Sequence, residues 1–380
     1  MKIGISAFAA DGGQSGIGQY IMNVIRRLPA CGDDAEIVVF APNRDRNLYD
    51  LEQLRITYVF TADFVSAPIV NILWHLIVFP ILLRRHRIDC AYMPAGNRRL
   101  SLFYGVPSVA TVHDFSQLHV KQKYDGLRMF YVNHVLPFFV RRLDKIVSVS
   151  KSTSRDLVEH AGVEEEKIRV VYNGTDARRF FGKDKSIAAG RVASELSIVK
   201  PYILYTARLE HPGKNHVRLI EAFARLKRRN VLEHQLVLAG SKWNGSDAIE
   251  GAAHRSGLGD EILMPGFVPD SLLPDLYSAA DLFVFPSLFE GFGIPLVEAM
   301  CCGIPICAAN VSSIPEVVGD AAILFDPYNI EEITEAMQRG LGDHSFRSTM
   351  ISRGLARARR FTWENTASDV FHTCLEAARA

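Results

Sequence analysis

The stretch LFEGFGIPLVEAM, residues 288–300, decides the fold of the second half of this chain. Residues 281–285, just before it, are apolar and β-prone, and Pro286 follows them, so they predict a buried strand. Pro295 suits the first turn of a helix, and Gly303 suits the position just after a helix. The stretch is therefore predicted to be a strand-to-helix loop followed by a helix that ends before Gly303.

Two carboxylates, Glu290 and Glu298, lie in this stretch with seven residues between them. Gly291 and Gly293 let the backbone approach a ligand closely. The unpaired N–H groups at the start of a helix favour an anion such as phosphate. A polyhydroxylated ligand that carries phosphate fits these features, whereas the alternative is a plain glycine turn between two solvated acids.

Length and composition set the broad class. A chain of 380 residues with 48% hydrophobic residues predicts two domains. The net charge of +1 gives no general field that would attract nucleic acid. The six cysteines form no C-x-x-C pair and no zinc spacing, so we expect free thiols and no metal site. The N-terminus shows no signal-peptide pattern, which predicts a cytoplasmic protein.

Two aromatic and basic segments raise the question of a membrane. Residues 65–83 approach the length of a transmembrane helix, but two prolines, an asparagine and a histidine interrupt them. We therefore expect a mostly buried helix that partly presents aromatic and basic side chains. Residues 128–145 have similar chemistry. Both segments are explained either by a peripheral membrane surface or by ordinary core helices with basic ends.

Strand and helix signals alternate along the whole chain, with short apolar runs that end in small or polar residues. This pattern is typical of parallel strands buried on both faces. It restarts after a charged segment near residues 180–195, which we interpret as a linker. We predict the α/β class, with two doubly wound Rossmann-like domains, 1–185 and 195–361, that face each other across a cleft.

Polar residues at the predicted strand ends are the candidate site, because ligands bind beyond the carboxyl ends of parallel strands. Arg208 and Lys214 follow one strand and suit a diphosphate, although solvated surface charges are the alternative. His113 follows another strand and can donate a hydrogen bond to a hydroxyl, although a capping His–Asp pair explains it too. Val268 follows a third strand and offers backbone groups to a nucleobase.

A glycine-rich loop near the N-terminus also precedes a predicted helix. Gly16 and Gly18 allow the backbone to approach a ligand there, although a flexible connection explains them as well. The loop lacks the full G-x-G-x-x-G fingerprint, and no acidic residue caps the second strand. A nicotinamide dinucleotide site is therefore poorly supported.

Together these residues resemble glycosyltransferase family 4, whose members are retaining, nucleotide-sugar-dependent enzymes with the GT-B fold. The most specific match is residues 283–327, which is similar to the E-x7-E signature of the family and the segment after it. Further matching stretches are GIGQYIMNVIRRL, TVHDFSQLH, KIVSVSKSTSRDLVEHAGVEEEKIRVVYNGTD and RLEHPGKNHVRLIEAF. The resemblance covers nearly the whole chain.

The resemblance implies a role for each matching position. Glu290 and His113 would face the donor sugar and are the candidate catalytic residues, and Glu298 would hold the ribose hydroxyls. Arg208 and Lys214 would neutralise the leaving diphosphate. The other implied donor-binding residues are Gly16, Gly18, Val268, Gly291, Phe292, Gly293 and Leu296. The final helix, residues 362–380, would pack back on the N-terminal domain, which is the acceptor side.

Two positions depart from the family pattern. The spacing from Arg208 to Lys214 is one residue longer than the commonest spacing in the family, which weakens their joint assignment to phosphate. His75 stands where related sequences often carry Glu, in the acceptor-side domain.

The resemblance predicts transfer of a hexose, with mannose from GDP-mannose favoured, to a glycan or lipid-linked oligosaccharide in surface-polysaccharide or O-antigen synthesis. The preference for mannose rests on the segments HDFS and SSIPEVVGDAA, which resemble those of bacterial mannosyl- and rhamnosyltransferases. No cofactor or metal is expected, because cations and helix N–H groups can stabilise the leaving diphosphate. The alternatives are a UDP-glucose enzyme of the same fold, a GT-B epimerase or phosphorylase, and a non-catalytic binding module. Acceptor, linkage position and oligomeric state stay open.

Overall fold

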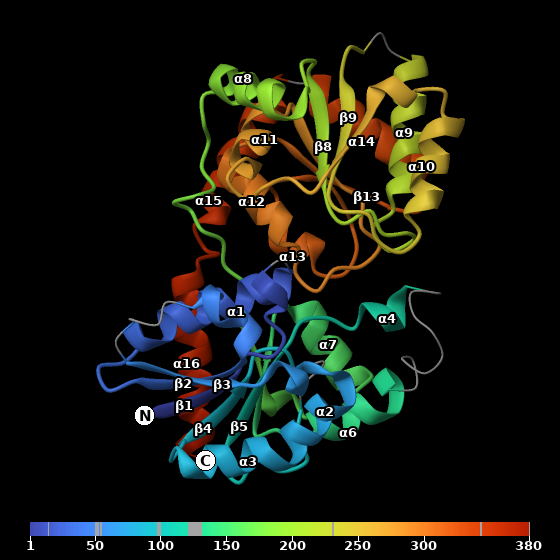
Figure 1. The fold of residues 1–380 in the computed structure, drawn as a ribbon. Coiled ribbons are helices and arrows are strands. Elements are labelled where there is room, and N and C mark those ends of the chain that lie inside the picture. Colours follow the sequence, from blue (N-terminus) through green and yellow to red (C-terminus); the bar gives the residue numbers. More distant parts are fainter. Residues whose placement is uncertain are drawn as a thin grey trace. The chain divides into compact units, whose positions relative to one another are not determined.

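The computed structural model describes residues 1–380 except 14, 50–52, 54, 97–99, 121–130, 230–231, 343 and 380. The chain forms two compact units (Figure 1). The first unit holds Met1–Gln117, Tyr124–Gly174 and Thr362–Ala380, and the second holds Leu118–Lys123 and Thr175–Phe361. The predicted boundaries at residues 185 and 195 are therefore wrong, because the main crossing from the first unit to the second lies between Gly174 and Thr175.

The first unit is built on a seven-stranded sheet in the order β3-β2-β1-β4-β5-β6-β7. All neighbouring strands are parallel. Most of their residues are buried, as expected for strands covered by helices on both faces. The strands are β1 (Lys2–Ser6), β2 (Glu36–Pro42), β3 (Ile56–Thr61), β4 (Cys90–Met93), β5 (Ser108–Val112), β6 (Lys145–Ser148) and β7 (Ile168–Val170).

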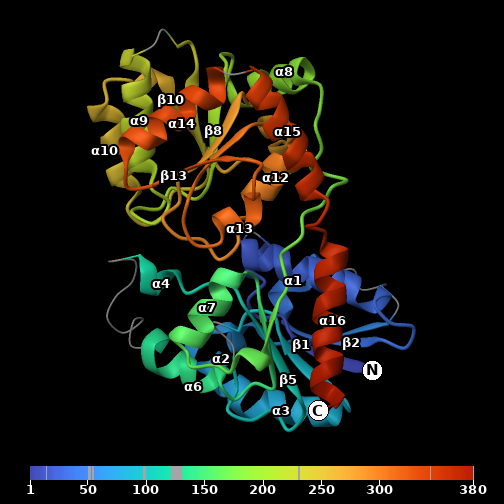
Figure 2. The ribbon, with the colours of Figure 1, turned by 180° about the vertical axis from the view of Figure 1, so that it is seen from behind.

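Helices in this part of the chain connect successive strands. They are α1 (Gly16–Arg27), α2 (Pro68–Leu73), α3 (Phe79–Arg85), α4 (Ser116–His119), α6 (Leu136–Val140) and α7 (Lys151–Glu159), with two π-helical segments, η5 (Trp74–Val78) and η6 (Tyr131–Val135). The last helix of the chain, α16 (Trp363–Arg379), packs on α1, β4, β5 and β6 of this unit (Figure 2). The N-terminal half of the fold is thus completed by the C-terminal helix.

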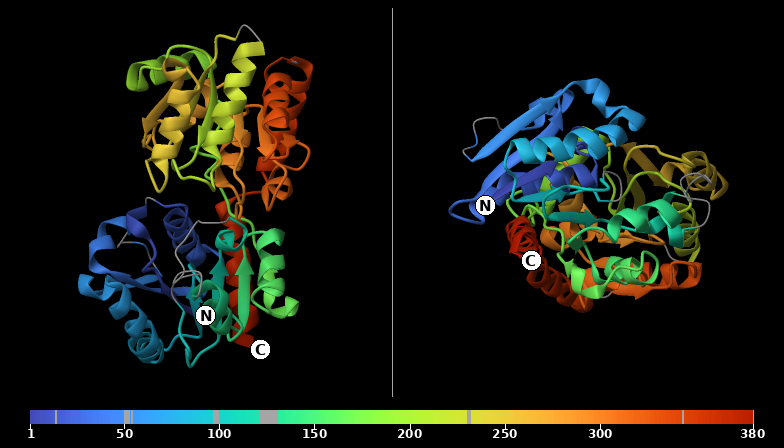
Figure 3. Two further views of the ribbon diagram at one scale, coloured as in Figure 1. Left: turned by 90° about the vertical axis from the view of Figure 1, so that its right-hand side faces the viewer. Right: turned by 90° about the horizontal axis from the view of Figure 1, so that it is seen from below.

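The second unit has a six-stranded parallel sheet in the order β10-β9-β8-β11-β12-β13. Its helices lie on both sides of this sheet (Figure 3, left). The strands are β8 (Tyr202–Thr206), β9 (Gln235–Ala239), β10 (Ile262–Gly266), β11 (Leu282–Phe285), β12 (Ile306–Ala309) and β13 (Ile323–Phe325). The helices are α8 (Lys185–Leu196), α9 (His216–Arg229), α10 (Ser246–Arg255), α11 (Leu273–Ala279), α12 (Ile294–Cys302), α13 (Ile314–Val318), α14 (Ile330–Gly342) and α15 (His344–Ala358).

Each strand order contains a point at which the direction of winding reverses. In the second unit it lies between β8 and β11, since β9 and β10 follow β8 on one side while β12 and β13 follow β11 on the other. Loops at the carboxyl ends of two such strands leave a crevice that binds ligands in open parallel sheets. The loop after β8 and the loop after β11 are therefore the best-placed segments of this unit.

The prediction of a linker is wrong for the second half of that segment, because residues 185–196 form the helix α8. Asp184 caps this helix by accepting hydrogen bonds from the N–H groups of Ser186 and Ile187, both at 3.0 Å. Ala188 and Val192 are buried where α8 packs on α11. In the sequence, Lys185, Arg191 and Glu195 interrupt this short apolar pattern, so the helix was not predicted.

The apolar segment near residues 65–83 is helical but not mostly buried, so that prediction is also wrong. The helix Pro68–Arg85 is long and apolar enough to cross a membrane by length and composition, yet only 28% of it is buried. The reason is that both of its faces are apolar, and only one of them packs on the unit. In the second such segment, residues 128–130 lie outside the described residues, and the rest includes η6 and α6.

Candidate active site

Glu290 and Glu298 lie on the loop and the helix that follow β11. The chain leaves β11 at Phe285, and α12 begins at Ile294, as the sequence predicts. Gly293, immediately before α12, has φ 98°, a conformation that only glycine adopts readily. Gly293 has no side chain with which to cap the helix, and Pro295 in the first turn has no N–H, so the Ile294 N–H is the first-turn group that we consider for a ligand.

Lys214 and Glu290 meet at this switch point. The Lys214 Nζ donates a hydrogen bond of 2.6 Å to Glu290 Oε1, and both side chains are largely buried. Lys214 comes from the loop after β8 and Glu290 from the loop after β11, so the pair joins the two best-placed loops. The ion pair fixes the orientation of both side chains, which suits a site that handles both hydroxyl groups and phosphate.

Two serines that the sequence analysis did not single out fix the loop that carries Glu290. Ser312 Oγ accepts from the Glu290 backbone N–H at 3.0 Å. Ser313 Oγ donates to the carbonyl oxygens of Glu290 and Phe292, at 2.9 and 3.1 Å. Ser312 holds φ 51°, which is unusual for serine and shows that the turn is tightly specified. These serines sit in the matched segment 283–327, but only the folded structure shows what they touch.

Glu298 lies one turn inside α12 and closes a buried polar chain. The Tyr277 hydroxyl donates to Glu298 Oε2 at 2.8 Å and lies 2.7 Å from Thr206 Oγ1. Burial is the main cause that raises the pKa of Glu298 to about 7, while the bond from Tyr277 lowers it. Above this pKa the ionised carboxylate of Glu298 accepts hydrogen bonds with both of its oxygens, so it can bind hydroxyl groups of a ligand.

Arg208 and Lys214 share one loop but face different neighbours. The Arg208 guanidinium lies 4.9 Å from the ring centroid of Trp243, and both residues are exposed. Lys214 points to Glu290 instead. The structure thus brings Lys214 to the predicted carboxylate and leaves Arg208 on the outer, aromatic side of the same loop, so a joint phosphate role for the two stays a prediction.

Four further predicted donor-binding residues are buried, which limits them to backbone contacts. They are Val268, Gly291, Phe292 and Leu296. The Leu296 N–H already bonds to the Gly293 carbonyl at 3.0 Å, and Phe292 packs against Phe361. The predicted contacts with donor sugar, phosphate and base therefore depend on other backbone atoms of these residues, and they stay predictions.

His113, at the end of β5 in the first unit, is buried. Its Nε2 lies 2.7 Å from the Pro94 carbonyl oxygen, a bond in which the ring nitrogen donates, and its ring meets Tyr20 edge-on. Asp114 instead caps the turn by accepting from the backbone N–H and hydroxyl of Ser116. The bond to Pro94 fixes the ring of His113 at a strand end, while its contact with the donor sugar stays a prediction.

The two glycines of the N-terminal loop differ in their surroundings. Ser15 caps α1 by accepting from the Gly18 N–H at 3.0 Å. A Cβ on Gly18 would lie 2.2 Å from the Ala10 carbonyl oxygen, so this glycine is required by packing within the unit. A Cβ on Gly16 meets no described atom within 4 Å. Only Gly16 has the open backbone that the predicted ligand contact needs.

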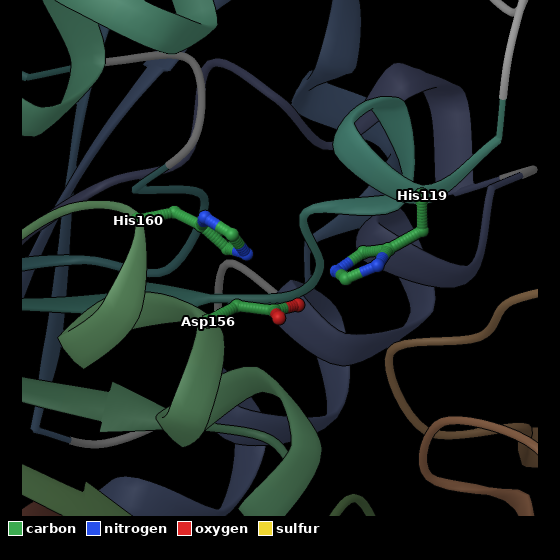
Figure 4. Close-up of side chains that lie close together, drawn as sticks. All are labelled: His119, Asp156 and His160. Carbon is green, nitrogen blue, oxygen red and sulfur yellow. The ribbon is translucent and has the colours of Figure 1, made fainter.

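Helix α7 brings together two side chains of the kind that bind metal ions. Asp156 and the adjoining His160 are four residues apart and project to the same side (Figure 4). His119, also drawn there, clusters with the second unit. Two ligands from one helix are fewer than a protein metal site uses. The absence of a metal site stays a prediction.

His75, the second departure from the family pattern, is a core residue. It is buried in η5, with Nε2 2.8 Å from Ser6 Oγ and Nδ1 2.7 Å from the Asn71 carbonyl oxygen. Its ring also meets Phe8 and Trp74. The histidine therefore ties the π-helical turn to the end of β1.

Two family models match the chain, one in each unit. The model Glycosyltransferase Family 4 matches residues 14–179, and the model Glycosyl transferases group 1 matches residues 191–357. The structure of Anabaena Alr3699/HepE in complex with UDP and glucose matches the fold with a TM-score of 0.75, over 99% of both chains and at 22% identity.

Two relatives from Escherichia coli share part of the sequence. O-antigen chain mannosyltransferase B is 39% identical over 171 residues, which is 45% of each protein. The serotype-specific mannosyltransferase WbdA is 32% identical over 268 residues, which is 68% of this chain and 32% of that protein. The chain thus spans less than half the length of these two relatives.

The two parallel α/β units match solved structures of the GT-B fold, which confirms the predicted fold class. The chain belongs to the glycosyltransferases that the family 4 and group 1 models describe, as the resemblance predicted.

Proposed function

We propose that this protein is a hexosyltransferase that moves mannose from a nucleotide sugar, with GDP-mannose favoured, to a glycan or lipid-linked oligosaccharide. The Lys214–Glu290 pair at the switch point of the second unit carries this proposal. The activities for which the two Escherichia coli relatives are named favour mannose and a role in O-antigen or other surface-polysaccharide synthesis.

In this proposal Glu290 orients hydroxyl groups of the donor sugar, and Lys214 holds Glu290 in place. When the sugar–phosphate bond breaks, negative charge develops on the leaving diphosphate. Lys214 and the Ile294 N–H at the start of α12 would stabilise that charge as it forms. Glu298, with its pKa near 7, would accept the ribose hydroxyls. Arg208, which lies against Trp243, would add a second cation for the diphosphate.

The proposed reaction keeps the configuration of the anomeric carbon by front-face attack, with the leaving phosphate accepting the proton of the acceptor hydroxyl. Double displacement would require a carboxylate nucleophile, and Glu290 is the candidate for that role. Mass spectrometry of the enzyme after rapid quenching tests the choice. A hexose covalently attached to Glu290 would show that front-face attack is wrong.

We also propose that the reaction needs no metal, because lysine and helix N–H groups take the place of a divalent cation. Turnover is expected to be unchanged after dialysis against EDTA. If activity is lost with EDTA and restored by Mg²⁺ or Mn²⁺, metal-independent transfer is wrong. The proposed location is the cytoplasm, at the inner face of the cell membrane.

The decisive experiment measures nucleoside diphosphate release from GDP-mannose and from UDP-glucose, with and without an oligosaccharide acceptor. We expect acceptor-dependent release of GDP. If UDP is released from UDP-glucose and no GDP from GDP-mannose, the donor is UDP-glucose. Consumption of the nucleotide sugar without an acceptor would favour an epimerase or phosphorylase. GDP is expected to raise the melting temperature more than UDP does.

The variant Glu290→Gln tests the site itself. It removes the charge that pairs with Lys214 and is expected to lower kcat by at least about 100-fold, the typical cost of losing a preorganised electrostatic group. Glu250→Gln is the matched control, because Glu250 pairs with Lys242 on the exposed surface of the same unit. If both variants turn over like the original protein, the assignment of Glu290 fails.

A further inference from the structure

The helical stretch Pro68–Arg85 has an apolar outer face. Ile69, Ile72 and Leu73 point to solvent on α2, with Ile69 75% exposed. Ile77 and Ile81 continue the same side through η5 and α3, at 58% and 60% exposure. Large apolar side chains gathered on one helix face mark an interaction surface, whereas single exposed ones do not. The face belongs to the unit that holds the N-terminus (Figures 1 and 2).

The opposite side of this stretch is firmly built into the unit. The ring centroids of Trp74 and Phe8 are 4.6 Å apart, and those of Phe79 and Phe40 are 5.4 Å apart. Leu83 packs on Gly4 of β1 so closely that a Cβ on that glycine would lie 2.7 Å from it. The stretch cannot leave the unit to cross a bilayer without opening this core. Any partner must therefore come to its outer face.

The apolar surface extends beyond the helix. Phe64, just before α2, is 69% exposed. Phe103 is also exposed and lies beside the end of α3, where the Arg84 guanidinium is 5.8 Å from its ring centroid. We call the set Phe64, Ile69, Ile72, Leu73, Ile77, Ile81 and Phe103 the apolar face.

Charge decides which partner fits the apolar face. The sequence has no charged residue from Phe64 to Leu83, and then Arg84, Arg85 and Arg87 follow, all three exposed. An amphipathic surface helix with arginines at one end suits a bilayer that contains anionic lipids. Its apolar side chains enter the headgroup boundary while the guanidinium groups stay with the phosphates.

We propose that the apolar face docks this protein on an anionic lipid bilayer, with α2, η5 and α3 lying in the plane of the surface. The proposal deepens the proposed function and rests on it only for the lipid-linked acceptor. Binding to the bilayer is measured without turnover, so the docking proposal and the proposed enzymatic activity are tested by separate experiments and can fail independently.

The test is sedimentation of the full chain with vesicles of phosphatidylcholine alone or mixed equally with phosphatidylglycerol. We expect binding to the mixed vesicles that weakens as salt rises. Ile72→Ser with Ile77→Ser should abolish it, and Arg84→Gln with Arg85→Gln should weaken it by on the order of 10-fold or more. Ile187→Ser and Arg228→Gln, at exposed positions of the second unit, are matched controls expected to bind normally.

Two results would overturn the proposal. One is equal sedimentation of the Ile72→Ser/Ile77→Ser variant and the original protein. The other is that the original protein does not bind vesicles and is a dimer in light scattering, while the same variant is a monomer. The apolar face would then join two copies of this chain. Circular dichroism and the melting temperature check that each variant is folded, and both should be unchanged because the substituted side chains are exposed.

Discussion

At the scale of single residues, the raised pKa of Glu298 makes a signed prediction about stability. The folded-state pKa of about 7 lies above the ordinary value of 4.5, so the folded protein holds this proton more tightly. The stabilising contribution is present below pH 4.5 and is lost as pH rises towards 7. Glu298→Gln removes this loss and should raise the free energy of unfolding at pH 8 by up to about 3 kcal/mol.

Urea unfolding of Glu298→Gln and of the original protein at pH 5 and pH 8 checks this prediction. The stability difference between the two proteins should be larger at pH 8 than at pH 5. A difference that does not depend on pH would mean that Glu298 titrates at its ordinary value. The same variant is expected to bind nucleotide more weakly, because an amide accepts hydroxyl hydrogen bonds less strongly than a carboxylate does.

Tyr277→Phe tests whether the buried hydroxyl positions Glu298. The substitution removes the donor 2.8 Å from Glu298 Oε2. Loss of one hydrogen bond to a charged group typically costs about 1.5–3 kcal/mol, so nucleotide should bind roughly 10- to 100-fold more weakly. The measurement is isothermal titration calorimetry with GDP and UDP.

Tyr202→Phe is the control for a lost buried hydroxyl. The Tyr202 hydroxyl donates a hydrogen bond of 2.6 Å to the Leu276 carbonyl oxygen. This bond does not involve Glu298. The substitution should lower the melting temperature and leave nucleotide affinity unchanged. Equal affinity losses in both variants would assign Tyr277 to general stability instead of to positioning Glu298.

Residue types and spacing predicted part of this site but could not predict its support. Glycine and proline around two acids indicate a loop and a helix start, because those residues act on the local backbone. Ser312, Ser313 and Tyr277 act through contacts that join distant parts of the sequence. A serine carries no local signal for the loop that its hydroxyl will hold, so only the folded chain shows these bonds.

At the scale of elements, the start of α1 separates ligand access from packing. Gly18→Ala would place a Cβ 2.2 Å from the Ala10 carbonyl oxygen and should destabilise the protein by about 1–3 kcal/mol. Gly16→Ala meets no described atom within 4 Å and should keep or slightly raise the melting temperature, since alanine favours a helix.

Steady-state kinetics then decides what the open glycine does. If the backbone at Gly16 approaches substrate, Gly16→Ala should raise KM several-fold in a fully folded protein. Unchanged kinetic constants would show that the glycines of this loop serve the structure alone. Near-equal melting temperatures of Gly16→Ala and Gly18→Ala would contradict the packing argument.

Strands and long helices were predictable from the sequence because burial on both faces leaves a strong apolar pattern. The predictions that were wrong concern elements whose exposed faces do not have the usual polar composition or whose buried faces are small. α8 follows a charged segment and buries only Ala188 and Val192, so its pattern indicated a linker, although Asp184 was an available capping signal. The stretch Pro68–Arg85 is apolar on both faces, so its pattern indicated burial that the fold provides on one face only.

At the scale of the whole molecule, the last helix closes the first unit from the far end of the chain. Trp363, Val370 and Phe371 of α16 are buried, and Thr366 Oγ1 donates to the Tyr172 carbonyl at 2.8 Å. A Cβ on Gly174 would lie 2.2 Å from the Trp363 nitrogen, so the backbones also pack closely. Residues separated by about half of the sequence thus complete one core.

Truncation after Phe361 should therefore destabilise the first unit selectively. Three large buried side chains contribute about 1.5–3 kcal/mol each, which together approaches the total stability of a typical domain. Hydrogen exchange followed by mass spectrometry should show faster exchange in β4, β5 and β6, which α16 covers, and unchanged protection in β8 and β11. Equal acceleration in both sheets would show that α16 supports the chain as a whole, and no change in either would show that the first unit folds without it.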